Sequence, residues 1–268
     1  MKVFENFFLS DDVSGADIIL DELLPFVHTT PLRNANKIIE SLELEKKRCA
    51  VFREDLLYFY YARPAYRKVE TEASTDKSLL PVVFVVRPAL INIKSVYPFD
   101  TGAYTRYYVP AHLSEDCEIY DYEMPNTTTA IQQYLMAVCG NNRSYFSGEF
   151  KSGNELPDSI KVLRKSNYDL DNLLNLISYT GRSNVDDRSY TVEVQTAENV
   201  GILDKLLAII APIYCTEDPK FIRMVQITSA EPYYYSFQPR HRVVEYVDVV
   251  YELVKKYYID SHYMEEES

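Results

Sequence analysis

The clearest pattern in this chain is an apolar strand that runs straight into a helix. Residues Leu24–Leu42 begin with an apolar run, pass through the polar sequence His-Thr-Thr, and continue with Ile38 and Ile39 at the spacing of a buried helix face. Pro31 suits the first helical turn, because its missing N–H would be unpaired there in any case. We therefore expect a strand, a polar corner and a helix N-terminus in direct succession.

Further stretches favour strands because they are rich in β-branched and aromatic residues or alternate between apolar and polar positions. They are Cys49–Arg67, Leu79–Arg87, Ser189–Thr196, and Phe221–Thr228 with Tyr233–Phe237 as its hairpin partner. Residues Ile91–Tyr104 also begin as a strand, and their proline, aspartate and glycine then predict a loop.

Apolar residues return to helical spacing in four places. These are Thr127–Cys139 with Gly140 as its stop, Leu170–Tyr179, Leu203–Ala211 and Arg240–Tyr258. The stretch Asn141–Pro157 has no such period and predicts a loop. With 47% hydrophobic and 25% charged residues, the composition is that of a globular protein. We expect a single α/β or α+β domain with insertions over residues 1–268.

The polar corner before the first long helix offers several ligand-binding groups in one place. His28, Thr29 and Thr30 supply an imidazole and two hydroxyls beside a helix N-terminus, whose N–H groups and dipole attract anions. A ligand that carries phosphate or ribose would suit such a corner. The alternative is structural: Thr30 caps the helix, and His28 ends a strand with its hydrogen bonds satisfied.

Two arginines bracket the proline turn that follows the second predicted strand. Arg63 and Arg67 carry guanidinium groups, which can bind a pyrophosphate bidentately when they face a polar corner. The alternative is that both arginines form surface ion pairs with Glu54, Asp55 or Glu70.

A late strand presents an acid and an amide on the same face. Because side chains alternate along a strand, Glu193 and Gln195 stand side by side in Ser189–Thr196. A carboxylate there can stabilise a developing cation or act as a base, while the amide orients an acceptor. The alternative is an ordinary solvated polar face. Asp100 is a further candidate acid, although aspartate before Thr-Gly is also typical of a turn.

The charge of the chain limits its partners. The formal net charge is −12, so a nucleic-acid ligand would require a local basic patch against an unfavourable overall field. Lys46, Lys47, Arg48 and Arg53 form a candidate patch, and the alternative is a solvated charged face.

The sequence lacks the motifs of several common enzyme classes. The sequence contains no P-loop, no GxGxxG, no HExxH and no GxSxG elbow. None of the four histidines has a histidine or cysteine at helical ligand spacing, so we expect no dedicated metal. The four scattered cysteines favour free thiols in a reducing cytoplasm. No signal peptide or membrane-spanning run is present, which favours a cytoplasmic protein without a membrane partner.

Three segments together resemble one family, the DarT-like ADP-ribosyltransferases. His28, Thr30 and Asn34, with the apolar pair Ile38 and Ile39 after them, resemble the family's His-x-Thr signature and the helix that follows it. The sequence FYYARPAY resembles its Tyr-Phe-x-x-Arg-Ser-Pro-Met strand and turn, and SYTVEVQ resembles its late Ala-Glu-Val strand.

The chain also departs from that family. Residues 68–188 are long for the family, and the segment Tyr97–Tyr104 has no place in its pattern. The acidic charge of the chain also sits poorly with a DNA acceptor. These departures concern the acceptor more than the cofactor.

The resemblance implies a fold, a co-substrate and a set of site residues. The implied fold is α+β, with an ADP-ribosyltransferase-like split central β-sheet, flanking helices and a long middle insertion over residues 68–188. The sheet would surround a cleft for NAD, which is consumed without a metal. The implied catalytic residues are Glu193 and Arg63. The implied NAD-binding residues are His28, Thr29, Thr30, Asn34, Tyr60 and Arg67.

The activity implied by the resemblance is transfer of one ADP-ribose from NAD to a macromolecular acceptor, either nucleic acid or protein. Such an enzyme would serve as a toxin or antiviral defence effector, and an antitoxin-like partner would neutralise it. Two alternatives remain open: an NAD glycohydrolase of the same fold, and a non-catalytic module that binds a protein partner. The sequence does not indicate the oligomeric state.

Overall fold

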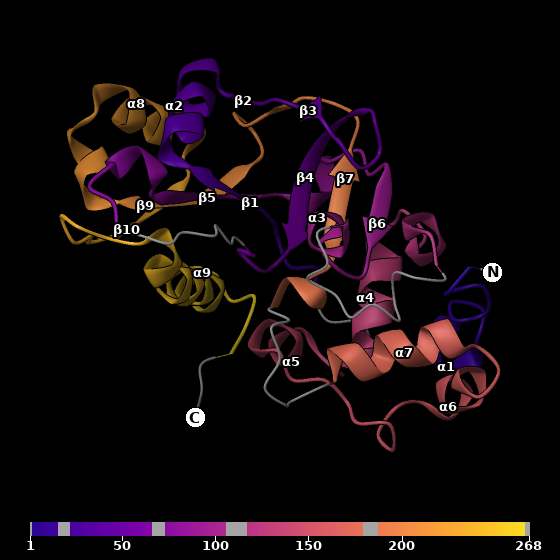
Figure 1. The fold of residues 1–268 in the computed structure, drawn as a ribbon. Coiled ribbons are helices and arrows are strands. Elements are labelled where there is room, and N and C mark those ends of the chain that lie inside the picture. Colours follow the sequence, from indigo (N-terminus) through magenta and orange to yellow (C-terminus); the bar gives the residue numbers. More distant parts are fainter. Residues whose placement is uncertain (1, 16–21, 66–72, 106–116, 179–186, 266–268) are drawn as a thin grey trace. The chain divides into compact units, whose positions relative to one another are not determined.

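The computed structural model describes residues 2–15, 22–65, 73–105, 117–178 and 187–265, which fall into two compact units (Figure 1). The first unit comprises Met1–Leu23, Ala50–Phe52 and Ile93–Gln195, and the second comprises Leu24–Cys49, Arg53–Asn92 and Thr196–Ser268. Helices and strands occur in both units, which confirms the predicted α+β class.

The second unit is built on a sheet with the strand order β10-β9-β5-β1-β4, and the short strand β3 also pairs with β4. Its strands are β1 (Phe26–Pro31), β3 (Lys47–Arg48), β4 (Asp55–Tyr61), β5 (Pro81–Val86), β9 (Leu206–Pro212) and β10 (Glu231–Tyr235). A separate small ladder joins β2 (Glu43–Leu44) to β8 (Val200–Gly201). The β9–β10 pair is parallel and the other pairs are antiparallel, so this sheet is mixed.

Three helices flank this sheet. They are α2 (Leu32–Ser41), α8 (Pro219–Thr228) and α9 (Val247–Asp260). Helices α2 and α8 lie together on one side of the sheet, whereas α9 lies on the other (Figure 1). Every residue of β5 is buried, because that strand is paired on both edges and covered on both faces. The core of this unit is therefore centred on β5.

The order of helix and strand after Leu203 is the reverse of the prediction. Leu203–Ala211 was expected to be a helix, but most of it belongs to β9, whose apolar run is too uniform to reveal its period. Phe221–Thr228 was expected to be a strand, but it belongs to α8, which begins at Pro219 behind the capping side chain of Asp218.

The hairpin predicted between Phe221–Thr228 and Tyr233–Phe237 is also wrong, because the first segment is helical. Strand β10 pairs with β9 in parallel, with Tyr233 opposite Ile210, and α8 forms the crossover between the two strands. A parallel pair requires a long connection of this kind, whereas a hairpin joins antiparallel strands.

The first unit is mainly helical. Its helices are α1 (Asp11–Ser14), α3 (Thr101–Thr105), α4 (Thr128–Val138), α5 (Asn142–Ser147), α6 (Asp158–Arg164) and α7 (Tyr168–Ile177). Strands β6 (Ser95–Tyr97) and β7 (Glu193–Thr196) pair in antiparallel fashion, with Tyr97 opposite Glu193 and Ser95 opposite Gln195. The predicted helices near α4 and α7 are confirmed, and Thr127 caps α4 through its side chain.

Two loop predictions in this unit need correction. Asn141–Pro157 contains α5, because Asn141 caps the helix and Gly148 ends it at a φ of 77°. The loop expected after β6 contains α3, which begins at Thr101. Strand β7 is also shorter than predicted, since it starts at Glu193 and a 3₁₀ turn at Asp187–Ser189 precedes it.

Within the described ranges, no helix combines the length and the apolar character of a membrane-spanning segment.

Candidate functional site

The imidazole of His28 occupies the place where strands β1 and β4 stop pairing. The ladder joins Phe26 to Tyr61 and Val27 to Tyr60. One residue further along β1, the His28 ring lies 2.9 Å from the main-chain carbonyl oxygen of Tyr58, measured from Nδ1. Because a carbonyl oxygen only accepts, Nδ1 carries the proton and donates it. The ring is therefore anchored to β4 through one nitrogen.

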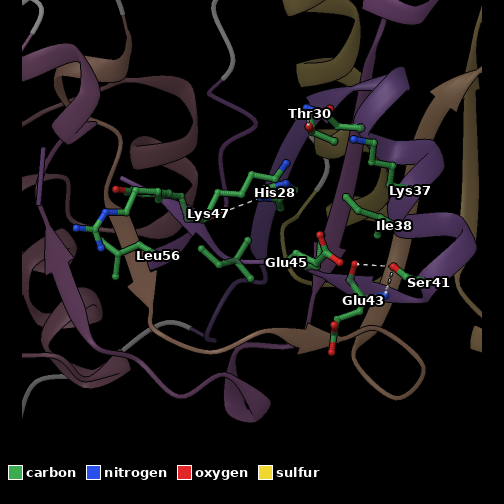
Figure 2. A pocket seen from close by; sticks show the side chains of 14 residues that line it. His28, Thr30, Lys37, Ile38, Ser41, Glu43, Glu45, Lys47 and Leu56 are labelled. Carbon is green, nitrogen blue, oxygen red and sulfur yellow. Dashed lines mark hydrogen bonds between the residues drawn. The ribbon is translucent and has the colours of Figure 1, made fainter. Parts of the chain in front are cut away.

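The surroundings of His28 favour the neutral imidazole. Burial of the ring lowers the pKa of His28 below its ordinary value. The hydrogen bond to Tyr58 acts in the opposite direction, and the nearby charge of Lys47 lowers the pKa further. With Nδ1 protonated and the ring neutral, Nε2 carries a lone pair and acts as an acceptor. Figure 2 shows the Lys47 side chain reaching toward His28.

A cavity of about 160 Å³ lies beside this histidine. His28 and Thr30 line it from β1, while Asn34 and Ser41 line it from α2 (Figure 2). Residues 34 to 41 of α2 span about 10 Å at 1.5 Å per residue, so the cavity follows the flank of the helix. The volume is below the roughly 300–1,000 Å³ of pockets that enclose a drug-sized ligand. The cavity could therefore enclose only part of a ligand of that size.

The expected anion site at the N-terminus of α2 differs in the structure. Pro31 is the N-cap, and it brings no side-chain cap. The first helical N–H, that of Leu32, donates to the carbonyl oxygen of Leu80 at 2.8 Å. The Thr30 hydroxyl does not cap the helix, because it instead accepts a long hydrogen bond of 3.4 Å from Asn34. The ligand-binding groups of this corner therefore face the flank of α2.

Three other nominated residues, Thr29, Tyr60 and Arg63, do not line this cavity. Thr29 points to the opposite face of β1 from His28 and Thr30, and its hydroxyl has no hydrogen-bond partner among the described residues. Tyr60 is half-buried on β4 and does not line the cavity. Arg63 is 4% exposed, and its guanidinium lies 5.4 Å from the ring centre of Tyr251 on α9. It is not a surface arginine.

Arg67 lies outside the described residues.

In the first unit, a buried acid stands on the short strand β7. Glu193 is 1% exposed, so the alternative of a solvated polar face is wrong. Its Oε1 accepts hydrogen bonds from the Thr101 hydroxyl at 2.8 Å and from the Gln195 amide at 2.7 Å. Its Oε2 accepts one from the Thr101 main-chain N–H at 3.1 Å. The predicted side-by-side arrangement of Glu193 and Gln195 is confirmed.

Burial raises the pKa of Glu193 well above its usual range, and the nearby charge of Asp100 raises it further. The hydrogen bonds from Gln195 and Thr101 favour the carboxylate and oppose this shift. An acid with a perturbed pKa that is held by specific donors is a candidate functional group.

Of the two residues that the turn after β6 adds to this cluster, the sequence indicated only one. Asp100 appeared as a possible site acid, whereas Thr101 did not appear at all. The signal lay in the Asp-Thr-Gly turn that follows a short strand. That signal names a turn, and it gives no indication that the turn reaches a residue 92 positions later in the chain.

The candidate residues are divided between the two units. His28, Thr30, Asn34 and Arg63 belong to the second unit, and Glu193 with its donors belongs to the first. In the described ranges, no three histidine, cysteine, aspartate or glutamate side chains gather as metal ligands.

Comparison with known proteins adds no family to this picture: no protein-family model matches the chain, and neither the curated proteins nor the solved structures include a match.

Proposed function

We propose that this protein is an NAD-dependent mono-ADP-ribosyltransferase, with Glu193 as its catalytic glutamate. The observation that carries the proposal is the burial of Glu193 on β7 with three hydrogen bonds to its carboxylate. Burying an ionisable group costs several kcal/mol unless it is well paired, and such cost is common at reactive sites. The resemblance of this strand to the late strand of DarT-like enzymes gives the same role.

The reaction exchanges one bond at the ribose for another. The bond between nicotinamide N1 and ribose C1′ breaks, and its electron pair leaves with nicotinamide. Positive charge develops on the ribose, where the Glu193 carboxylate would stabilise it. A nucleophile on the acceptor then bonds to C1′, and Glu193 takes the proton that the nucleophile loses.

The pocket beside α2 supplies groups that complement NAD. The neutral His28 Nε2 would accept a hydrogen bond from an amide N–H or a ribose hydroxyl, and both occur at the nicotinamide end of the molecule. Thr30 and Asn34 add a hydroxyl and an amide to the same lining, and Lys37 and Lys47 add positive charge. Contact between Arg63 and the pyrophosphate stays a prediction, as do the contacts of Thr29, Tyr60 and Arg67.

The biological role follows the same proposal. An enzyme that modifies a macromolecule at the expense of NAD would act as a toxin or defence effector, and its host would require a neutralising partner. The acceptor would be a nucleic acid or a protein.

Transfer of label from NAD tests the proposed function. The purified protein is incubated with NAD labelled in its adenylate part, together with separate protein, DNA, RNA and small-molecule fractions. We expect label in one macromolecular fraction. The label should disappear with Glu193→Gln and persist with Glu217→Gln, which changes an exposed glutamate. NAD loss without a labelled macromolecule would identify a glycohydrolase. Absence of both NAD binding and NAD loss would favour a protein-interaction module.

A further inference from the structure

At the turn that joins β6 to α3, Thr101 donates two hydrogen bonds to the Glu193 carboxylate. Thr101 offers its main-chain N–H to one carboxylate oxygen and its hydroxyl to the other. The turn is itself held firmly, because the Asp100 N–H donates to the carbonyl oxygen of Arg188 at 2.9 Å. The Asp100 carboxylate in turn accepts from the Ala103 N–H at 2.9 Å, as an N-cap residue does. Thr101 is therefore fixed in front of the acid.

The hydrogen bonds distinguish the two oxygens of Glu193. A carboxylate has about four acceptor positions, two on each oxygen. From the part of the chain that the structure describes, Oε1 receives two donors at 2.7 and 2.8 Å, whereas Oε2 receives one at 3.1 Å. Oε1 is the anchored oxygen, and Oε2 retains a position for one further donor.

We propose that Thr101 is the positioning residue of Glu193: it holds Oε1 in place so that Oε2 is presented to the ribose of NAD. The inference rests on the transferase function proposed above. Thr101 does not touch the reacting atoms and acts only through Glu193. Its hydroxyl is the part of this device that a substitution can remove, because the main-chain N–H remains in every variant.

The groups around Glu193 shift its pKa in opposite directions. Asp100 repels the ionised carboxylate from the turn, while Thr101 and Gln195 donate to it. Tyr97 stands opposite Glu193 in the β6–β7 register. Removing the Thr101 hydroxyl takes away a bond to the ionised form and should raise the pKa of Glu193. Replacing Asp100 by asparagine removes a like charge, and the pKa should then fall.

The test follows Glu193 directly, and then follows turnover. Glutamate side-chain carboxyl carbons are labelled with ¹³C in the full chain, and the Glu193 resonance is identified by its loss in Glu193→Gln. Its titration is recorded for the parent, Thr101→Val, Thr101→Ser and Asp100→Asn. Steady-state kinetics with NAD are measured on the same proteins, and circular dichroism checks that each one is folded. If Thr101→Val does not fold, Thr101→Ala removes the same hydroxyl.

We expect Thr101→Val to raise the pKa of Glu193 by about one unit. We also expect it to lower kcat about 10-fold at unchanged KM. Thr101→Ser should restore both properties, and Asp100→Asn should shift the titration the opposite way. An unchanged Glu193 titration in folded Thr101→Val overturns the assignment of Thr101. If the parent protein consumes no NAD, the transferase function fails, while the titration still decides the role of Thr101.

Discussion

The imidazole of His28 is bonded to the main-chain carbonyl oxygen of Tyr58, with 2.9 Å between Nδ1 and the oxygen. This bond fixes the tautomer, because only a protonated Nδ1 can donate to a carbonyl. It also fixes the ring plane relative to β4. The consequence is a neutral Nε2 acceptor beside the cavity along α2, and the proposed function assigns this nitrogen a contact with NAD.

Replacing His28 by alanine should weaken NAD binding about 10-fold, which corresponds to loss of one hydrogen bond of roughly 1.4 kcal/mol. Isothermal titration calorimetry of NAD into the protein measures the change. His262→Asn serves as the control, because His262 is exposed and its φ of 62° suits asparagine. Equal affinities for the parent and His28→Ala would remove His28 from the binding site.

The stability of the protein should depend on pH through Glu193. The folded-state pKa of Glu193 is raised by burial, so its contribution to the free energy of unfolding is fully present below the unfolded value of about 4.3. That contribution is lost as the pH rises through the folded-state pKa, at no more than about 1.4 kcal/mol per pH unit. Glu193→Gln lacks the ionisation, so its stability relative to the parent should increase between about pH 5 and pH 9.

Urea unfolding of both proteins at several pH values measures this difference. Two stability curves that stay parallel over the whole range would show that Glu193 has the same pKa in the folded and the unfolded chain.

The buried hydroxyl of Tyr258 should stabilise the end of β4. It donates to the carbonyl oxygen of Ala62 at 2.7 Å, next to a backbone with a φ of 57°. Tyr258→Phe leaves this buried carbonyl without its tyrosine donor, so we expect a loss of about 1–3 kcal/mol in the free energy of unfolding. Chemical denaturation measures the loss. Tyr168→Phe is the control, since Tyr168 is 74% exposed and its change should stay within about 0.5 kcal/mol. Equal losses in the two variants would contradict the assigned role of the hydroxyl.

Where a local signal was strong, the sequence predicted the fold well. The β-branched run of β5 and the helical spacing of α4 were both found where expected. The order of β9 and α8 was wrong, because β9 is buried almost throughout and therefore shows no polar face to reveal a period of two. The parallel β9–β10 pairing could not be predicted either, because it depends on knowing that α8 is a helix.

The sequence likewise predicted some contacts of the candidate site and not others. Glu193 and Gln195 are two residues apart on a strand, so their contact follows from local geometry. Thr101 binds Glu193 across 92 residues, and a pattern of neighbouring residues carries no information about such a contact. The partner of His28 is a main-chain carbonyl, which every residue possesses and which therefore leaves no mark in the sequence.

The proposed role of Glu193 in NAD cleavage is tested most directly by comparing NAD binding with NAD turnover in the parent and in Glu193→Gln. We expect the variant to bind NAD with an affinity close to that of the parent, while its turnover falls by at least about 100-fold. Turnover of NAD by Glu193→Gln at the parent rate would show that Glu193 takes no part in the reaction.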